Sequence, residues 1–459
     1  MKYYKLTTVF FTVLFSISLL VSCEYDNLNQ DPTRPGGESV PLVAIVPAMQ
    51  TQTHRNIVSE LGRYAGIIMQ QWQGFDAQQL EYTSYVIGES EPDAVWNLGF
   101  YTGSMRDAAD IIERATMTNA LNTRGIAKIY MAINLGLVTN AWGDVPYSEA
   151  FLGQENLSPK YDDQEEIYAS IQMLLSEAID DLNADDISGI QGDLLNGSNE
   201  QWISAAHSLK ARFYLEQTSV NPNAAQLALD ELDMAVSSNT EQLNFQFENT
   251  QNGGNPLALF GFQRINTIII DDFFVNLMMG DPRMDLYMTE TDGGNFLYFQ
   301  ANNPDLFWAQ LNSPSPVISY SETKFIEAEA LARTGEDGTE ALEEAVRANM
   351  TYLGITSSEI DEYLNNLPSI SIQTIILEKY KAMYGQAPMQ VWNDYRRTGF
   401  PDLIPNPNGV NPLNPSGIVP RRLLYTISQR LSNPNEYQAA IDSQGGHLLD
   451  DDIWVFPIN

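Results

Sequence analysis

Aromatic side chains in segments without a helical pattern are the residues of this sequence with the clearest capacity for chemistry. A sugar ring has an apolar face of C–H groups, which an aromatic ring can cover, and a rim of hydroxyls, which polar neighbours can bind. The aromatics in such segments are Trp72, Phe75, Tyr82, Tyr298, Phe299 and Trp308. Each of them, taken alone, is also suited to capping the hydrophobic core, so both interpretations stay open.

Four further tryptophans lie in or beside helical patterns. Trp142, Trp202 and Trp392 follow helical spacing and are predicted to belong to the core. Trp96 stands where a loop enters a helix, and its position predicts neither role more strongly than the other.

Residue patterns of known catalytic and metal sites are missing. The sequence holds no G-x-S-x-G elbow, no P-loop, no H-E-x-x-H pair and no complete EF-hand loop. Its histidines, His54, His207 and His447, are far apart, and His207 is expected to pack in a helix. A run of three aspartates at 450–452 suits a solvated turn better than a calcium site. We therefore expect a protein that has no enzymatic activity, no cofactor and no bound metal.

Helices must position these side chains, because apolar residues recur at helical spacing along most of the chain. We expect helices in residues 42–72 (two), 95–115, 122–142, 167–182, 200–217, 224–237, 320–333, 339–352, 370–385 and 389–397. Residues 74–93 carry no helical stripe and are expected to form a long loop.

Paired helices with alternating small and large residues favour a repeat scaffold. Residues 200–217 with 224–237, and 320–333 with 339–352, place alanines among larger apolar residues, as tetratricopeptide hairpins do. The predicted fold class is mainly α, a tetratricopeptide-like helical hairpin scaffold with long irregular loops. Residues 238–319 differ in composition, because they are rich in Asn, Gly, Pro and aromatic residues. Within them, only 268–279 are expected to be helical.

The first residues read as an export signal. Lys2 and Lys5 precede an apolar run of about 16 residues, shorter than the roughly 20 that a spanning helix needs. Cys23, the only cysteine, closes this run where a bacterial lipoprotein signal is cut and acylated. The prediction is a signal peptide at 1–22, lipidation at Cys23, a tether at 23–38 and a single domain at 39–459, with the loop-rich insert at about 238–319. An ordinary secretory signal is the alternative.

The net charge of the chain disfavours some classes of partner. The formal charge of −35 at pH 7 repels nucleic-acid phosphates and anionic lipid headgroups. Neutral ligands and basic partner surfaces remain possible.

Several motifs together resemble a known family. They are Ala141-Trp142-Gly143-Asp144-Val145-Pro146-Tyr147, the run from Ser319 to Ala330 that ends in Ala-Glu-Ala, Glu378–Tyr384 with Val391–Gly399, Pro420-Arg421-Arg422-Leu423, and Ile453-Trp454-Val455. With Cys23 they make the chain similar, over nearly its whole length, to the SusD/RagB family of outer-membrane nutrient-binding lipoproteins, in its SusD-like subgroup.

This resemblance implies a helical lipoprotein at the cell surface, anchored by lipid in the outer membrane. It implies a SusC-like TonB-dependent transporter as partner and an oligosaccharide, or in some cases a peptide, as ligand. The ligand would be delivered without being cut. Trp72, Asp76, Trp96, Tyr298 and Trp308 lie in regions similar to those that contact ligand in the family, a regional match and not a motif match. The alternatives are a structural lid of the transporter with no ligand site, and an anchored glycan hydrolase.

Overall fold

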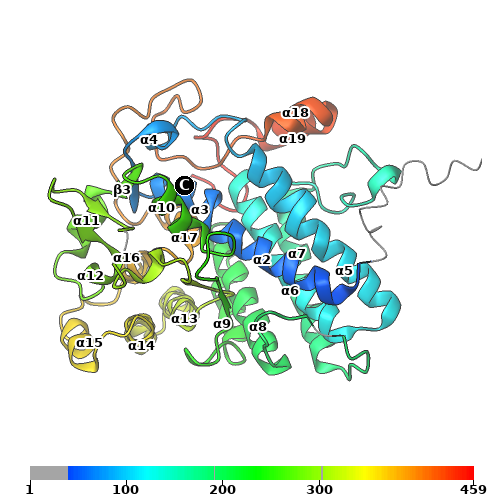
Figure 1. The fold of residues 1–459 in the computed structure, drawn as a ribbon, viewed down its shortest axis with the longest axis horizontal. Coiled ribbons are helices and arrows are strands. Elements are labelled where there is room, and N and C mark those ends of the chain that lie inside the picture. Colours follow the sequence, from blue (N-terminus) through cyan, green and yellow to red (C-terminus); the bar gives the residue numbers. More distant parts are fainter. Residues whose placement is uncertain (1–39, 191, 301–302, 459) are drawn as a thin grey trace, which may run out of the picture.

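The computed structural model describes residues 40–190, 192–300 and 303–458, and it is built mainly of helices (Figure 1). The predicted signal peptide, Cys23 and the tether lie outside these residues. Within the described part of the chain, none of the helices combines the length and apolar character that crossing a bilayer requires.

A row of packed helices forms the scaffold. Its members, in chain order, are α2 (Leu42–Val58), α3 (Glu60–Ile68), η2 (Val95–Ser104, a π-helix), α5 (Met105–Thr118), α6 (Leu121–Trp142), α7 (Gln164–Asn183), α8 (Asn199–Leu215), α9 (Ala224–Leu232), α13 (Tyr320–Thr334), α14 (Thr339–Tyr352), α15 (Ser357–Leu364), α16 (Ile372–Ala382) and α17 (Pro388–Thr398). Helix α6 packs on α5 and α7, α7 on α8, α8 on α9, α9 on α13, and α13 on α14 and α16. This succession of helical neighbours confirms the predicted mainly α hairpin scaffold.

Sequence signals at the helix ends account for several boundaries. Ser198 accepts a hydrogen bond from the backbone N–H of Gln201 while the Gln201 side chain accepts one from Ser198, a capping box at the start of α8. Ser319 caps α13 in the same position, accepting from the Glu322 N–H. Pro388 opens α17, where a missing N–H costs nothing.

The segment between α9 and α13 is irregular, as expected, but its secondary structure differs from the prediction. It contains α10 (Pro256–Gln263), α11 (Asp272–Met278), α12 (Met284–Tyr287) and the short strands β2 (Asn244–Gln246), β3 (Ile268–Ile270), β4 (Thr289–Glu290), β5 (Phe296–Leu297) and β6 (Pro314–Pro316), with the 3₁₀ turn η5 (Phe307–Ala309). The expectation of one helix over 268–279 was wrong at its start. Three consecutive isoleucines there form β3, since β-branched side chains suit a strand.

Two predictions near the N-terminal half also need correction. Residues 74–93 are not wholly irregular, because β1 (Trp72–Gly74) leads into α4 (Ala77–Thr83), which Asp76 caps. The helix expected over 95–115 is two helices, η2 and α5, and the backbone of Gly103, in the last turn of η2, leaves the helical range.

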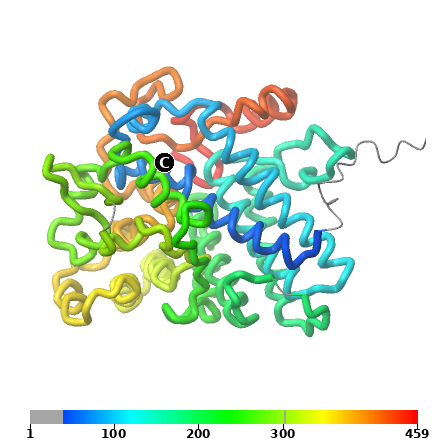
Figure 2. Tube along the Cα trace, viewed as in Figure 1, coloured from blue at the N-terminus to red at the C-terminus, as the bar shows by residue number. Residues whose placement is uncertain are grey.

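The C-terminal segment returns to the N-terminal helices. It includes α18 (Ile427–Ser432) and α19 (Pro434–Gln444), and Figure 2 shows it in orange and red running among the blue and cyan helices. The backbone N–H of Leu423 donates to the Ala141 carbonyl at 2.7 Å, and Arg422 donates to the carbonyl of Trp142 at 2.6 Å. Trp142 Nε1 donates in turn to the Leu424 carbonyl at 2.9 Å. Two of the motifs that resemble the family thus bind each other directly.

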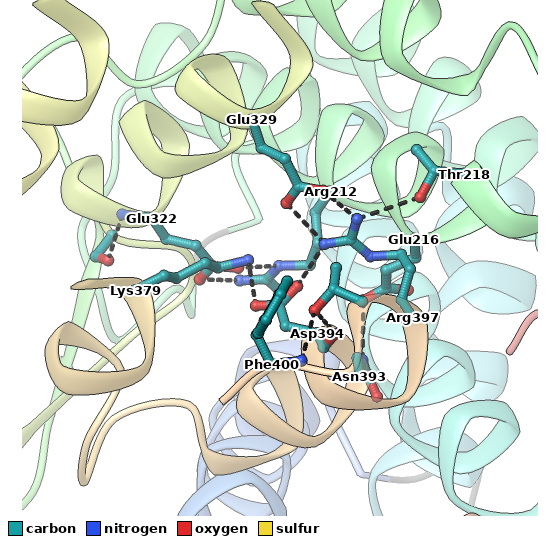
Figure 3. A network of polar contacts seen from close by, with 12 residues as sticks. Arg212, Glu216, Thr218, Glu322, Glu329, Lys379, Asn393, Asp394, Arg397 and Phe400 are labelled. Carbon is teal, nitrogen blue, oxygen red and sulfur yellow. Dashed lines mark hydrogen bonds and ion pairs between the residues drawn. The ribbon is translucent and has the colours of Figure 1, made fainter. Parts of the chain in front are cut away.

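A buried polar network holds the middle of the scaffold together. Arg397 and Lys379 contact Asp394, and Arg397 also contacts Glu329 (Figure 3). Arg212 forms a two-point ion pair with Glu322, both distances being 2.7 Å. Charged groups buried this deeply must be paired, so these contacts link α8, α13, α16 and α17 in one arrangement.

Candidate functional site

The antiparallel pair β1–β3 positions the exposed ring of Phe75. Trp72 pairs with Ile270 and Gly74 with Ile268, and the ladder continues one step further. There the backbone N–H of Phe75 donates to the Thr267 carbonyl at 2.8 Å. The pairing fixes Phe75 at the end of the ladder, against the turn that joins α10 to β3.

We use the name aromatic rim for three phenylalanines: Phe75, which follows β1, Phe262, which lies near the end of α10, and Phe299, which follows β5. Phe75 is 49% exposed and Phe262 54% exposed, although large apolar side chains usually lie inside. The Phe299 ring meets Phe262 edge to face, with centroids 6.3 Å apart. Phe75 and Phe262 are therefore exposed to solvent, while Phe299 is partly buried against the core.

The backbone beneath the rim leaves little room for movement. A Cβ placed on Gly261 would lie 2.6 Å from Cβ of Phe299 and 2.8 Å from the hydroxyl oxygen of Tyr298. Such a close approach needs a glycine. Tyr298 donates a hydrogen bond to the Leu257 carbonyl at 3.4 Å, which ties the rim to α10.

Polar side chains lie close to the rim residues along the sequence. The guanidinium of Arg63 lies 4.2 Å from the ring centroid of Phe260, a cation–π contact. Arg264 and Asn266 are exposed on the turn after α10, and Asp76 is exposed beside Phe75. Rings flanked by guanidinium, amide and carboxylate groups can cover an apolar face and bind hydroxyls at its edge.

A partly buried carboxyl follows β3 directly. Asp271 caps α11 by accepting from the Phe273 N–H at 2.8 Å. Burial raises the pKa of Asp271 to about 6, and the charge of Asp272 adds to that rise. Its role is to end β3 and start α11.

The residues predicted from sequence to contact ligand lie mostly in the core. Trp72 and Tyr298 are brought together, with ring centroids 6.0 Å apart, but they are only 1% and 3% exposed. Trp72 Nε1 donates to the hydroxyl of Tyr384 at 3.1 Å. Trp308 is buried against Phe307 and Tyr352. These three rings present no open face to a ligand in this structure, so direct contact by them stays a prediction.

Trp96 belongs to a different cluster. It is fully buried between Tyr101 and Trp142, and near Tyr425. This aromatic cluster lies where the Trp-Gly-Asp motif meets the C-terminal segment, so the structure does not bring Trp96 to the rim. Asp76 is the one predicted residue that is exposed, and its Oδ1 accepts from the Ala77 N–H at 2.8 Å.

Sequence reasoning found part of the rim and missed part. Phe75 and Phe299 were among the loop aromatics, while Phe262 was not singled out. It lies at the end of a short helix that is apolar on every side, Pro256–Gln263, where periodicity does not separate exposed from buried positions. The predicted core residues Trp142, Trp202 and Trp392 are all buried.

Two of the histidines have polar partners inside the fold. His54 lies between Ser315 and the hydroxyl of Tyr130, and burial lowers its pKa to about 3. His207 Nδ1 lies 2.6 Å from Glu231. In residues 40–190, 192–300 and 303–458, no three His, Cys, Asp or Glu side chains are grouped to hold a metal ion.

Several solved structures of other proteins have the same fold as this chain. A chitin-binding protein superposes with a TM-score of 0.78 at 23% identity, covering 91% of this chain and 100% of its own. A SusD/RagB family protein from Bacteroides thetaiotaomicron gives 0.76 at 24% identity, covering 92% and 100%. A chitin-binding SusD homolog from Flavobacterium johnsoniae gives 0.75 at 18% identity, covering 91% and 99%.

Sequence comparison adds the family. No curated protein matches this chain. A family model named SusD-like, described as starch-binding associating with outer membrane, matches residues 37–426. Since this match covers most of the sequence, the chain belongs to the SusD-like family of outer-membrane-associated binding proteins.

Proposed function

We propose that the protein is a cell-surface lipoprotein that binds a nutrient oligosaccharide at the aromatic rim and passes it to a SusC-like TonB-dependent transporter without cutting it. The exposure of Phe75 and Phe262 on a fixed backbone carries this proposal. An exposed phenyl ring can be covered by the apolar face of a ligand, which makes these two rings candidates for a contact.

Glycan is the ligand class that best suits the rim. Sugar rings stack on phenyl faces, and the neighbouring Arg264, Asn266 and Asp76 offer both donors and acceptors for hydroxyls. Two structural relatives are named as chitin-binding and the family description names starch, which supports glycan over peptide. Neither name identifies the sugar bound by this chain.

A panel of oligosaccharides tests the ligand. Affinity electrophoresis and calorimetry with malto-oligosaccharides, chitin oligosaccharides and other glycans are expected to give saturable binding to one class. Product chromatography after long incubation is expected to show the glycan intact. Release of shorter fragments would favour the anchored hydrolase, and failure to bind every glycan and peptide would favour the structural lid.

The anchor and the partner have separate tests. Mass spectrometry of protein purified from membranes of the native cell is expected to show a mature N-terminus at acylated Cys23, and a Cys23→Ala variant is expected to lose membrane association. The transporter is expected to co-purify with the wild-type protein in mild detergent. A freely soluble, unmodified native protein would contradict the lipoprotein assignment.

A further inference from the structure

A cavity of about 700 Å³ lies between α15, α16 and the turn that joins α11 to α12. Figure 1 shows these four helices on the same side of the molecule. Ligand sites in proteins usually enclose about 300–1,000 Å³, so the cavity has the size of such a site. We call it the α15–α16 cavity, and the part of its lining that matters here is Leu277, Tyr363, Asn366, Leu367, Gln373 and Lys381.

A buried polar network fixes Tyr363 in the wall of the cavity. The Tyr363 hydroxyl donates to Oε1 of Glu378 at 2.8 Å and accepts from Nζ of Lys381 at 2.8 Å. Nη2 of Arg283 also donates to this hydroxyl at 3.2 Å, and Arg283 pairs with Asp281 as well. The network is electrically neutral, because it holds two carboxylates and two cations. A side chain that is already held in this way loses little further freedom when a ligand binds.

Part of the Tyr363 ring is open to the cavity. The residue is partly exposed and belongs to the lining. Nζ of Lys381 lies 2.8 Å from the hydroxyl oxygen but 5.5 Å from the ring centroid, which places the cation beyond the hydroxyl end of the ring and not above its face. The apolar side chains of Leu277 and Leu367 belong to the same lining. A phenol ring in such surroundings can cover the C–H face of a sugar.

Two amide side chains in the lining have hydrogen-bonding capacity to spare. Asn366 and Gln373 are both exposed. Asn366 donates to the Glu362 carbonyl at 2.7 Å, and no described residue donates to its Oδ1. Within the described chain, the one hydrogen bond of the Gln373 side chain is long, from Nε2 to Oδ2 of Asp402 at 3.5 Å. An amide offers donors and an acceptor, which matches the hydroxyl groups of a sugar.

The charged groups of the cavity favour a neutral ligand over an ionic one. Lys381 is the one cation among the described residues of the lining, and Glu378 and the Tyr363 hydroxyl already bind it. Glu359 is held by Thr356 in the capping box at the start of α15. Glu362 is exposed to water, where a single carboxylate attracts a cation only weakly. An anion would have to displace an existing contact of Lys381, whereas a hydroxyl group would not.

We propose that the α15–α16 cavity binds a neutral saccharide, one ring of which stacks on Tyr363 while its hydroxyls bind the amides of Asn366 and Gln373. This second site goes beyond the proposed function, because it shares no residue with the aromatic rim and does not depend on it.

Calorimetry on the Phe75→Ala/Phe262→Ala variant tests the cavity apart from the aromatic rim. The probes are four neutral sugars: maltotriose, triacetylchitotriose, xylotriose and mannotriose. At least one is expected to bind saturably, with the same Kd at low and high salt, because salt does not screen contacts to a neutral ligand. Failure of all four to bind, or an affinity that falls with salt, would overturn the proposal. Since this variant lacks two rings of the rim, a rim that binds no glycan would leave the result unchanged.

Two substitutions of Tyr363 separate the effect of its ring from that of its hydroxyl. Tyr363→Phe and Tyr363→Ala both remove the hydrogen bonds to Glu378 and Lys381, so both disturb the buried network. Only Tyr363→Ala removes the ring, and it is expected to bind the saccharide at least about tenfold more weakly than Tyr363→Phe. Equal affinities of the two variants would contradict stacking on Tyr363.

Two adjacent asparagines provide matched variants that leave the buried network intact. Asn365 and Asn366 are both exposed after α15, but only Asn366 lines the cavity. Asn366→Ala is expected to weaken saccharide binding about two- to tenfold and Asn365→Ala to leave it unchanged. Equal effects would contradict the site. If Asn366→Ala instead lost co-purification with the transporter and kept its saccharide affinity, the cavity would be a protein contact and the proposal would be wrong.

Discussion

Arg397 of α17 and Glu329 of α13 form a two-point ion pair across the interior, with Nη2 and Oε2 2.7 Å apart. Both side chains are buried, and they lie in two separate sequence motifs that resemble the SusD/RagB family. Figure 3 shows that Arg397 reaches Asp394 and Thr218 as well. The motifs therefore mark a contact within the fold.

Removing one partner of this ion pair should make the protein easier to unfold. Arg397→Met leaves Glu329 buried with less compensation and is expected to lower the free energy of unfolding by about 3–5 kcal/mol. The matched control is Arg347→Met, because Arg347 pairs with Asp361 at the surface, where such pairs contribute about 0–1 kcal/mol. Urea unfolding measures both. Equal, small losses would mean that the buried network is not needed for stability.

The buried histidine should make stability depend on pH. Burial lowers the pKa of His54 to about 3, whereas an unfolded histidine takes up a proton near pH 6.5. Between these values the unfolded state binds more protons, so the free energy of unfolding falls as pH decreases from about 6.5. His54→Gln is expected to reduce this slope.

The comparison for His54 is His447, whose pKa is lowered to about 4 by burial and by Arg422. The double variant His54→Gln/His447→Gln should lose more of the slope between about pH 6.5 and about pH 5 than either single variant. Denaturant titrations at several pH values provide the slopes. A slope that neither substitution changes would contradict the account.

A glycine beneath Trp72 should not tolerate a methyl group. A Cβ on Gly66 would lie 2.2 Å from Cε3 of the Trp72 ring, closer than any real contact. Gly66→Ala must displace the indole and is expected to cost about 1–3 kcal/mol. Gly293→Ala is the control, since only Thr291 Oγ1 lies near, at 3.8 Å. Thermal unfolding distinguishes the two, and an unchanged midpoint for Gly66→Ala would show that the core around Trp72 is loose.

The scaffold could be predicted from sequence because long helices carry a periodic signal. Residues 339–352 were expected as a helix and α14 has those bounds. The short strands were not predicted, since β1 and β3 have three residues each and gain their stability from pairing across the chain. Local sequence does not record a partner about 200 residues away.

The site was harder to predict than the fold. A tryptophan in a loop can face solvent or fill the core, and the large rings Trp72, Trp96 and Trp308 are all buried here. The smaller rings Phe75 and Phe262 remain exposed, the first on the chain that continues the β1–β3 pair and the second on α10. Exposure is decided by tertiary packing, which periodicity alone does not contain.

The most direct test of the account is calorimetric titration of the glycan that binds best into the double variant Phe75→Ala/Phe262→Ala. The control is Leu157→Ala, which removes an exposed apolar side chain outside the aromatic rim. Circular dichroism should show both proteins folded. The account predicts a Kd at least about tenfold higher for the double variant and an unchanged Kd for the control. Wild-type affinity in the double variant would contradict the assignment of the aromatic rim as the glycan-binding site.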